Sequence, residues 1–221
     1  MNLPAAGLDL RAALRLTVIS DAHLARGRTH TEIVRQALRG GATAIQLRDK
    51  EGEDREFLAA AQEVAVLCGR AGALFLVNDR VDVACLAGGG CHLGPDDLGL
   101  REARGLLPFP ALLGFSAGTP AEAVAAAEAG ADYLGVGPIF ATSSKEDAGE
   151  PLAVEGLAEI VAATTLPVVA IGGIHTGNAA ACIAAGACGV AVIRAVVSAA
   201  TVAPAARALR RAVDLALEKE E

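Results

Sequence analysis

Short runs rich in β-branched residues alternate with alanine-rich stretches of helical length along nearly the whole chain. This alternation is typical of repeated βα units, which build a parallel sheet covered by helices. Eight units can be placed, and their strands are expected at 14–20, 44–49, 74–79, 91–94, 111–116, 133–139, 167–173 and 189–195. Helices are expected to fill the intervals, with clear candidates at 31–39, 54–68, 119–129, 154–163, 176–185 and 203–218.

Two architectures use such units, the closed (β/α)8 barrel and the doubly wound open sheet. The number of units favours closure, and the chain of 221 residues matches the roughly 200 to 250 residues of one barrel domain. Polar residues also recur at the C-terminal ends of the expected strands, which meet at one mouth in a barrel. We therefore predict an α/β fold, a single (β/α)8 TIM barrel domain over residues 1–221, with residues 1–13 a peripheral N-terminal segment.

Composition excludes several function classes. The formal net charge of -7 argues against a general nucleic-acid or membrane-surface binder, because such proteins usually cluster cations. No apolar run approaches the roughly 20 residues of a membrane helix, and no secretory signal pattern opens the chain, so we expect a cytoplasmic protein. The five cysteines contain no CxxC pair and are expected to be buried free thiols rather than a metal or redox site: Cys68, Cys85, Cys91, Cys182 and Cys188.

A first polar group lies at the end of the second expected strand. Alternation along the strand places Gln46 and Arg48 on one face, and Lys50 follows just beyond. The planar fork of an arginine and the mobile charge of a lysine together suit a diphosphate or polyphosphate. The alternative is a solvated pair of cations at a strand end, because charged residues prefer water to a barrel interior.

Carboxylates form a second group. Asp79 follows Asn78 at the end of the third strand, and Asp97 follows the fourth. Two carboxylates from separate strand ends can hold a Mg²⁺ ion that keeps part of its water and contacts substrate phosphates. The competing interpretation assigns Asp97 to a turn, where a short side-chain acceptor satisfies local N–H groups.

Two further groups follow strands six to eight. The loop from Thr142 to Lys145 carries hydroxyls and an ammonium that could bind an anion or close over one, although it also fits an ordinary hydrophilic loop. Glycines 172 and 173 lie at the end of strand seven, and Ile193-Arg194 lies at the end of strand eight. Barrels commonly bind phosphate there through backbone N–H groups; the alternative is that the glycines serve only turns.

The sequence resembles the thiamine-phosphate synthase family over nearly its whole length. Seven ordered motifs carry the resemblance, and an ordered set is far more specific than any single motif. They are QLRDK (46–50), VNDRVDVA (77–84), CHLGPDD (91–97), GFSAGTPAEA (114–123), GADYLGVGPIFATSSK (130–145), VVAIGGI (168–174) and GACGVAVIRAV (186–196).

The resemblance implies a transferase that joins 4-amino-2-methyl-5-hydroxymethylpyrimidine diphosphate to 4-methyl-5-(2-phosphooxyethyl)thiazole, giving thiamine phosphate and pyrophosphate. The implied mechanism is a Mg²⁺-assisted dissociative substitution, in which the pyrimidine C–O bond breaks before the thiazole nitrogen attacks. Arg48, Lys50, Lys145 and Ser116 are the implied catalytic residues, and Asp79 and Asp97 are the implied metal ligands. The implied substrate-binding residues are Gln46, Arg48, Lys50, Asn78, Ser116, Thr142, Ser144, Lys145, Gly173, Ile193 and Arg194.

The chain departs from the family pattern at two positions, Gly118, where many relatives carry His, and Arg194, where Ser is usual. The alternative functions are a thiazole tautomerase relative, which uses a His at the position of Gly118, a barrel that only binds a phosphorylated ligand, and a sugar-phosphate isomerase. Lys50 and Lys145 are also candidates for Schiff-base chemistry, although neither lies alone in an apolar stretch. The expected partners are the two small substrates and, in a homo-oligomer, further copies of the chain.

Overall fold

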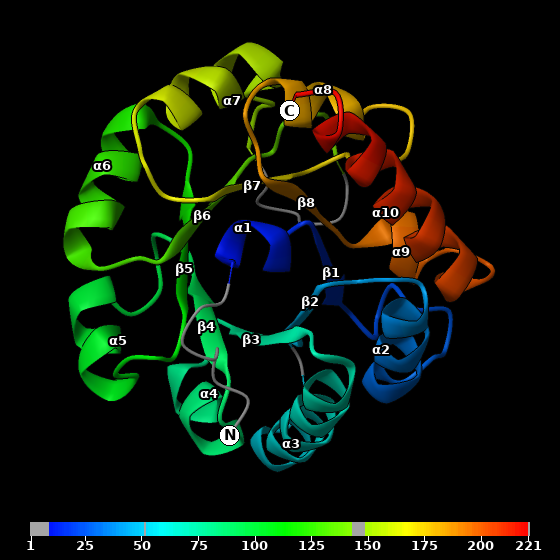
Figure 1. Cartoon of the computed structure of the whole chain (residues 1–221). Helices are drawn as coiled ribbons and strands as arrows, with labels where there is room; N and C mark the ends of the chain where they lie inside the picture. The colour runs from blue at the N-terminus through cyan, green and yellow to red at the C-terminus, as the bar shows by residue number, and fades with distance from the viewer. Residues whose placement is uncertain (1–8, 51, 143–148, 221) are drawn as a thin grey trace.

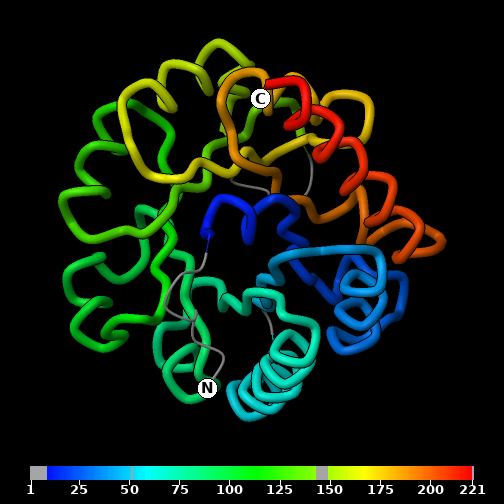
Figure 2. The backbone as a smooth tube through the Cα atoms, in the orientation of Figure 1, coloured from blue at the N-terminus to red at the C-terminus, as the bar shows by residue number. Residues whose placement is uncertain are grey.

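The computed structural model describes residues 9–50, 52–142 and 149–220. Eight parallel strands form a closed barrel in chain order, and β1 pairs with β8 to complete the ring. Figure 1 shows the strands surrounded by helices, and the tube in Figure 2 shows the same two concentric layers. The strands are β1 Leu16–Ser20, β2 Ala44–Leu47, β3 Leu74–Asn78, β4 Gly90–Leu93, β5 Leu113–Ala117, β6 Tyr133–Val136, β7 Val168–Ile171 and β8 Gly189–Val192.

At least one helix follows each strand, and the predicted barrel is confirmed. All six clear helix candidates correspond to helices of the structure, whereas the short helices α4 and α5 were not predicted. The helices are α1 Leu10–Ala13, α2 His30–Arg39, α3 Asp54–Ala71, α4 Val81–Ala87, α5 Leu100–Leu106, α6 Pro120–Ala129, α7 Ala153–Ala162, α8 Ala179–Ala184, α9 Arg194–Val197 and α10 Val202–Leu217.

The eighth strand ends earlier than the sequence suggested. Residues 193–195 were expected to continue it, but the ladder to β1 stops where Val192 pairs with Val18. Ile193 leaves the extended conformation with φ -111° and ψ -84°, and Arg194 then begins α9. The chain therefore turns abruptly at the mouth of the barrel, where a helix start follows directly on a strand end.

Threonine caps fix two helix starts. The Thr29 side chain accepts from the Glu32 N–H, and the Glu32 carboxylate accepts from the Thr29 N–H at 2.8 Å, a complete capping box at α2. The predicted start of α6 is confirmed, because Thr119 accepts from the Glu122 N–H and Pro120 occupies the first turn. The local sequence thus determines where each of these two helices begins.

Aliphatic residues fill the core, since the strands contain few rings and their residues are mostly buried. At the N-terminal end, Leu10 of α1 packs against this core, and α1 crosses the middle of the ring (Figure 1). Four of the five thiols are buried as expected, but Cys85 is exposed because α4 buries its other face. Among the described residues no helix is long and apolar enough to cross a membrane.

Candidate active site

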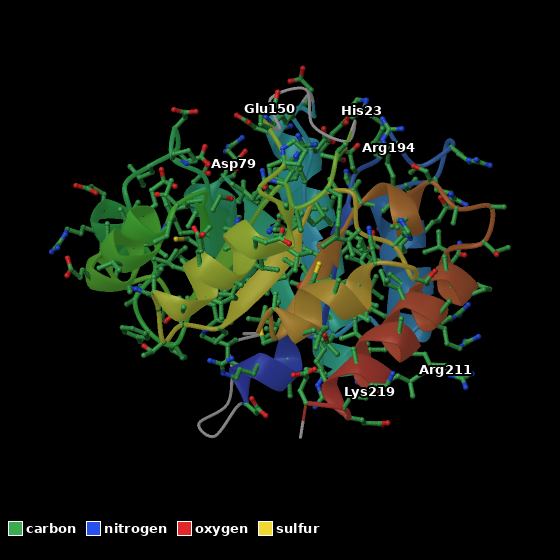
Figure 3. The ribbon with its side chains drawn as sticks, turned by 90° about the horizontal axis from the view of Figure 1, so that it is seen from above. His23, Asp79, Glu150, Arg194, Arg211 and Lys219 are labelled. Carbon is green, nitrogen blue, oxygen red and sulfur yellow. The ribbon has the colours of Figure 1, made fainter. Side chains whose placement is uncertain are left out.

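The C-terminal ends of the strands surround a cavity of about 860 Å³. Figure 3 shows Asp79 and Arg194 at this end of the barrel, with α1 at the opposite end. Gln46 is buried but is absent from the cavity wall, and Ser144 and Lys145 lie outside the described residues. The predicted residues that line the cavity are Arg48, Lys50, Asn78, Asp79, Asp97, Ser116, Thr142, Gly173, Ile193 and Arg194.

A buried ion pair holds Arg48 in the wall. Its Nη1 donates to Asp21 Oδ2 at 2.6 Å, and both side chains are less than a tenth exposed. The other oxygen of Asp21 accepts from the N–H groups of His23 and Leu24, so the carboxylate also orders the turn after β1. Arg48 Nε has no hydrogen-bond partner among the described residues. The arginine is therefore fixed in place while a buried N–H remains unsatisfied, a costly arrangement that a bound anion relieves.

The role of Asp21 was not predicted from the sequence. The sequence did show that Asp21 directly follows the first strand, as Asp79 follows the third. A carboxylate there is equally suited to bind metal or to pair with a cation, and only the register between β1 and β2 brings Asp21 to Arg48.

A second network orders the strand end that carries Lys50. Asp49 Oδ1 accepts from the Gly52 N–H at 2.9 Å, and Asp49 Oδ2 lies 3.4 Å from Nε2 of the buried His30. The Nδ1 atom of His30 lies 2.9 Å from Ser20 Oγ. This chain of contacts links the ends of β1 and β2 through the first turn of α2, and so restrains the backbone just before Lys50.

The two predicted metal ligands both face the cavity. Asp79 has φ +63°, a left-handed conformation that is uncommon for a residue other than glycine. Asp97 also serves its loop, because its Oδ2 accepts from the Gly94 N–H at 2.7 Å. The capping and cavity-lining interpretations of Asp97 are thus compatible, since Oδ1 makes no contact with the Gly94 N–H.

Two carboxylates suit an ion such as Mg²⁺, which keeps part of its water, better than they suit a metal ion whose ligands all come from the protein. Carboxylate oxygens are the ligands that Mg²⁺ prefers, with water and phosphate supplying the rest of its shell. Within the described part of the chain, no group of three or more His, Cys, Asp or Glu side chains is placed to hold a metal. Because Asp79 and Asp97 lie beside an open cavity, there would be space for the water and phosphate ligands that Mg²⁺ also takes.

A hydrogen-bonded chain runs from the barrel interior to Ser116. His92 Nε2 lies 3.0 Å from Ser116 Oγ, and His92 Nδ1 lies 2.9 Å from the Tyr133 hydroxyl. Burial raises the pKa of Tyr133 well above its usual range, so its phenol stays protonated. Gln46 opposes this rise in the pKa of Tyr133, which places its side chain next to Tyr133 inside the barrel.

The role of His92 was not predicted from the sequence. Glycines make its position possible, because a Cβ on Gly135 would lie 2.9 Å from His92 Cε1, and one on Gly114 would overlap the rings of His92 and Tyr133. Two glycines on the strands next along, opposite a strand histidine, were the available signal, but the strand register was needed to read it.

The glycine turn after β7 presents backbone to the cavity. Gly172 and Gly173 have φ +96° and +66°, and a Cβ on Gly173 would lie 2.6 Å from the Ala141 carbonyl oxygen. Within the described residues, no backbone acceptor pairs with the N–H of Gly173 or of Ile193. Because β7 and β8 are neighbours, these loops offer two donors to one anion, the arrangement common at this place in barrels.

Taken together, the fold and the cavity define a (β/α)8 barrel enzyme whose cavity lies at the C-terminal ends of its strands. A family model described as thiamine monophosphate synthase matches residues 16–196. The chain belongs to the thiamine monophosphate synthase family, which confirms the resemblance read from its motifs.

Individual relatives agree. A thiamine-phosphate synthase of Methanoculleus marisnigri is 53% identical over 196 residues, covering 88% of this chain and 93% of the relative. One of Moorella thermoacetica is 53% identical over 205 residues, covering 92% and 98%. Among solved structures, a thiamine phosphate pyrophosphorylase from Pyrococcus furiosus superposes with a TM-score of 0.88 at 41% identity, covering 95% of this chain and all of that one.

Proposed function

We propose that the chain is a thiamine-phosphate synthase that joins the pyrimidine diphosphate to the thiazole monophosphate. One observation carries the proposal. A single cavity has cations and carboxylates after β2, β3 and β4 on one side, and on another it has backbone N–H groups after β7 and β8 that pair with no described backbone acceptor. Such a cavity suits two different phosphorylated molecules at once. The relatives named thiamine-phosphate synthase support the same activity.

The diphosphate is proposed to bind at the cationic side. Arg48 is held by Asp21, and its Nε has no hydrogen-bond partner in the described part of the chain, so it can donate to phosphate without rearranging. Lys50 and Asn78 line the same part of the wall, and Lys145 is assigned here from the resemblance alone. Asp79 and Asp97 would hold Mg²⁺, which when bound neutralises charge on the diphosphate.

The pyrimidine is proposed to lie beside Ser116, whose hydroxyl is oriented by His92. Gln46 is proposed to act through its contact with Tyr133 inside the barrel, because it does not line the cavity. The thiazole phosphate is assigned to the donors after β7 and β8, namely Gly173, Ile193 and Arg194, together with Thr142 and Ser144. Since the donors at Gly173 and Ile193 are backbone N–H groups, an Arg in place of a Ser at 194 leaves them intact.

The reaction then needs little covalent work from the protein. The C–O bond between the pyrimidine methylene and the diphosphate breaks, and the bonding electrons leave with pyrophosphate. The thiazole nitrogen supplies the electron pair for the new C–N bond. Fixed cations next to the departing group, Arg48 and Lys50, stabilise the negative charge that develops on it, and this preorganised stabilisation is usually the largest catalytic contribution.

We also propose that the reaction takes place in the cytoplasm. All five cysteines are free thiols, which suit a reducing environment.

The test mixes the purified chain with both substrates and Mg²⁺ and measures thiamine phosphate and pyrophosphate. Equal amounts of the two products are expected, and none is expected after chelation of the metal. A folded protein that binds the thiazole phosphate but forms no product would contradict the proposal and favour the binding-only alternative. Product formed by tautomerisation of a thiazole precursor, without diphosphate turnover, would favour the tautomerase alternative.

A further inference from the structure

His175 lies in the cavity wall two residues after Gly173. Its backbone is fixed by Asn178, whose Oδ1 accepts from the His175 N–H at 2.8 Å. The amide of the same side chain donates to the Gly173 carbonyl oxygen at 3.0 Å. One asparagine therefore ties His175 to Gly173, so the two residues keep a constant relative position.

The imidazole ring is fixed as well. The Gly177 N–H donates to His175 Nδ1 at 3.1 Å. The ring also rests directly on Gly177, because a Cβ there would lie 3.1 Å from Cε1 and 3.2 Å from Nδ1. These contacts hold one edge of the ring and leave Nε2 without a hydrogen bond to any described residue.

The bond at Nδ1 determines the tautomer. A ring nitrogen that accepts an N–H carries no proton, so the neutral imidazole of His175 has its proton on Nε2. The Nε2–H group is then a donor with no hydrogen-bond partner among the described residues, and His175 lines the same cavity as Gly173 and Ile193, whose N–H groups have no backbone acceptor there. Several such donors in one wall suit an anion.

We propose that Nε2–H of His175 donates a hydrogen bond to the phosphate of the thiazole substrate, which makes His175 a residue that selects the phosphorylated thiazole over the free alcohol. The inference rests on the proposed function and deepens it. The diphosphate is the less suitable ligand, because His175 is on the loop after β7 while Arg48 and Lys50 follow β2, three strands further round the barrel.

The kinetic test compares His175→Ala with the unaltered chain. The KM for thiazole phosphate is expected to rise about tenfold, the equivalent of about 1.4 kcal/mol. The KM for the pyrimidine diphosphate and kcat are expected to stay within about twofold, because the contact is a binding contact made before and during reaction. Thr176→Ala, at an exposed neighbour outside the cavity wall, is the matched control and is expected to change neither constant.

Two further variants separate a phosphate contact from a loop-ordering role. His175→Gln places an amide donor at similar reach and is expected to recover part of the affinity, whereas Gly177→Ala keeps the imidazole but displaces it and is expected to raise the same KM. Inhibition by 5-(2-hydroxyethyl)-4-methylthiazole, which lacks the phosphate, is expected to be equal in the unaltered chain and in His175→Ala. Equal loss of affinity for the alcohol and the phosphate would overturn the proposal in favour of loop ordering.

A titration with inorganic phosphate reads the contact without any reaction. In ¹⁵N-labelled protein, phosphate is expected to shift the Nε2 signal of His175 and to leave Nδ1 in its acceptor state. A shift at His175 in a chain without synthase activity would reject the proposed function and keep the phosphate contact. An active enzyme whose thiazole-phosphate KM is unchanged in His175→Ala would reject the contact and keep the function.

Discussion

Asp79 holds a left-handed backbone conformation at the end of β3, with φ +63°. Such a conformation costs a residue with a Cβ roughly 1–2 kcal/mol, and strain of this kind persists where the surrounding structure enforces it, often at functional sites. Asn tolerates the same conformation. Asp79→Asn should therefore keep the fold, lose the charge of a proposed metal ligand, and lower turnover by a factor on the order of 100, with a weaker response to Mg²⁺. Rate against Mg²⁺ concentration, together with thermal unfolding, measures both effects.

Asp96 and Asp97 form the matched pair for that experiment. Both line the cavity, but the family resemblance assigns only Asp97 as a ligand, and Asp97 Oδ2 also accepts from the Gly94 N–H. Asp97→Asn is expected to lower turnover and Mg²⁺ response as Asp79→Asn does, whereas Asp96→Asn should alter them less than about twofold. Equal effects at 96 and 97 would remove Asp97 from its assigned position as a ligand.

The buried Asp21–Arg48 pair makes a stability prediction. Removing one partner of a buried pair leaves an uncompensated charge and typically costs about 3 to 5 kcal/mol. Asp21→Asn is therefore expected to lower the free energy of unfolding by about 3 kcal/mol, measured by urea denaturation at neutral pH. Glu63→Gln breaks the exposed pair with Arg35 and should cost less than about 1 kcal/mol. Similar losses in the two variants would show that Arg48 gains little from Asp21.

Single residues were predictable where their chemistry was unusual for their place. Cations and carboxylates at strand ends stand out because charged groups avoid barrel interiors, so Arg48 and Asp79 could be proposed before any fold was known. Asp21 and His92 could not, because their roles depend on a partner from another strand. The pairing of β1 with β2, and of β4 with β5, supplies those partners.

At the scale of elements, the glycine turn after β7 predicts a selective loss. Gly173→Ala introduces a Cβ at φ +66° that also meets the Ala141 carbonyl oxygen at 2.6 Å. The turn must move, so the KM for thiazole phosphate is expected to rise by about tenfold or more, the loss of roughly one hydrogen bond to a charged group, with little change for the pyrimidine diphosphate.

Gly72 offers a control for conformational strain alone. It has φ +67°, nearly the same as Gly173, and a Cβ there would meet nothing within 4 Å. Gly72→Ala should lower stability by about 1 kcal/mol and leave both KM values unchanged. If the two variants raised the KM alike, the loss at Gly173 would reflect general destabilisation rather than the turn's contact with substrate.

Elements were predictable in proportion to their length and pattern. The strands and five of the six helix candidates carry enough residues for their period to show. The helices α4 and α5 have only seven residues each, too few turns for a clear amphipathic pattern. The six-residue α8 was predicted only as part of a longer candidate at 176–185. The start of α9 was mistaken for strand because Val192, Ile193 and Val196 have the branched side chains that also favour strands.

For the whole molecule, the number of βα units predicted that the sheet closes into a barrel. This closure explains why residues from distant parts of the chain line one cavity. In the closed ring α10 lies beside α2, as Figure 2 shows, so the two ends of the repeat pack together. All eight strand ends consequently meet, and residues separated by more than 140 positions, such as Arg48 and Arg194, share one cavity. The motifs predicted the family, and its relatives confirm that prediction.

The buried thiols are expected to make the barrel less stable at alkaline pH. Burial raises the pKa of Cys68 to about 12 and that of Cys182 and Cys188 to about 11, and it raises the pKa of Cys91 as well. Because these folded-state values exceed the ordinary value of 9.0, the folded barrel keeps protons that the unfolded chain releases. This stabilisation is fully present below about pH 9 and is lost as the pH rises toward the folded-state values.

Urea denaturation from pH 7 to 10.5 under reducing conditions measures this loss. A fully buried thiol such as Cys68 should contribute about 1.4 kcal/mol of lost stability per pH unit above its unfolded pKa. Cys68→Ala lowers stability at pH 7 by leaving a small cavity, but it should make the decline above pH 9 shallower. Cys85→Ala removes the exposed thiol and should change that slope less. Parallel curves for the unaltered chain and Cys68→Ala would mean that Cys68 ionises as readily in the folded barrel as in the unfolded chain.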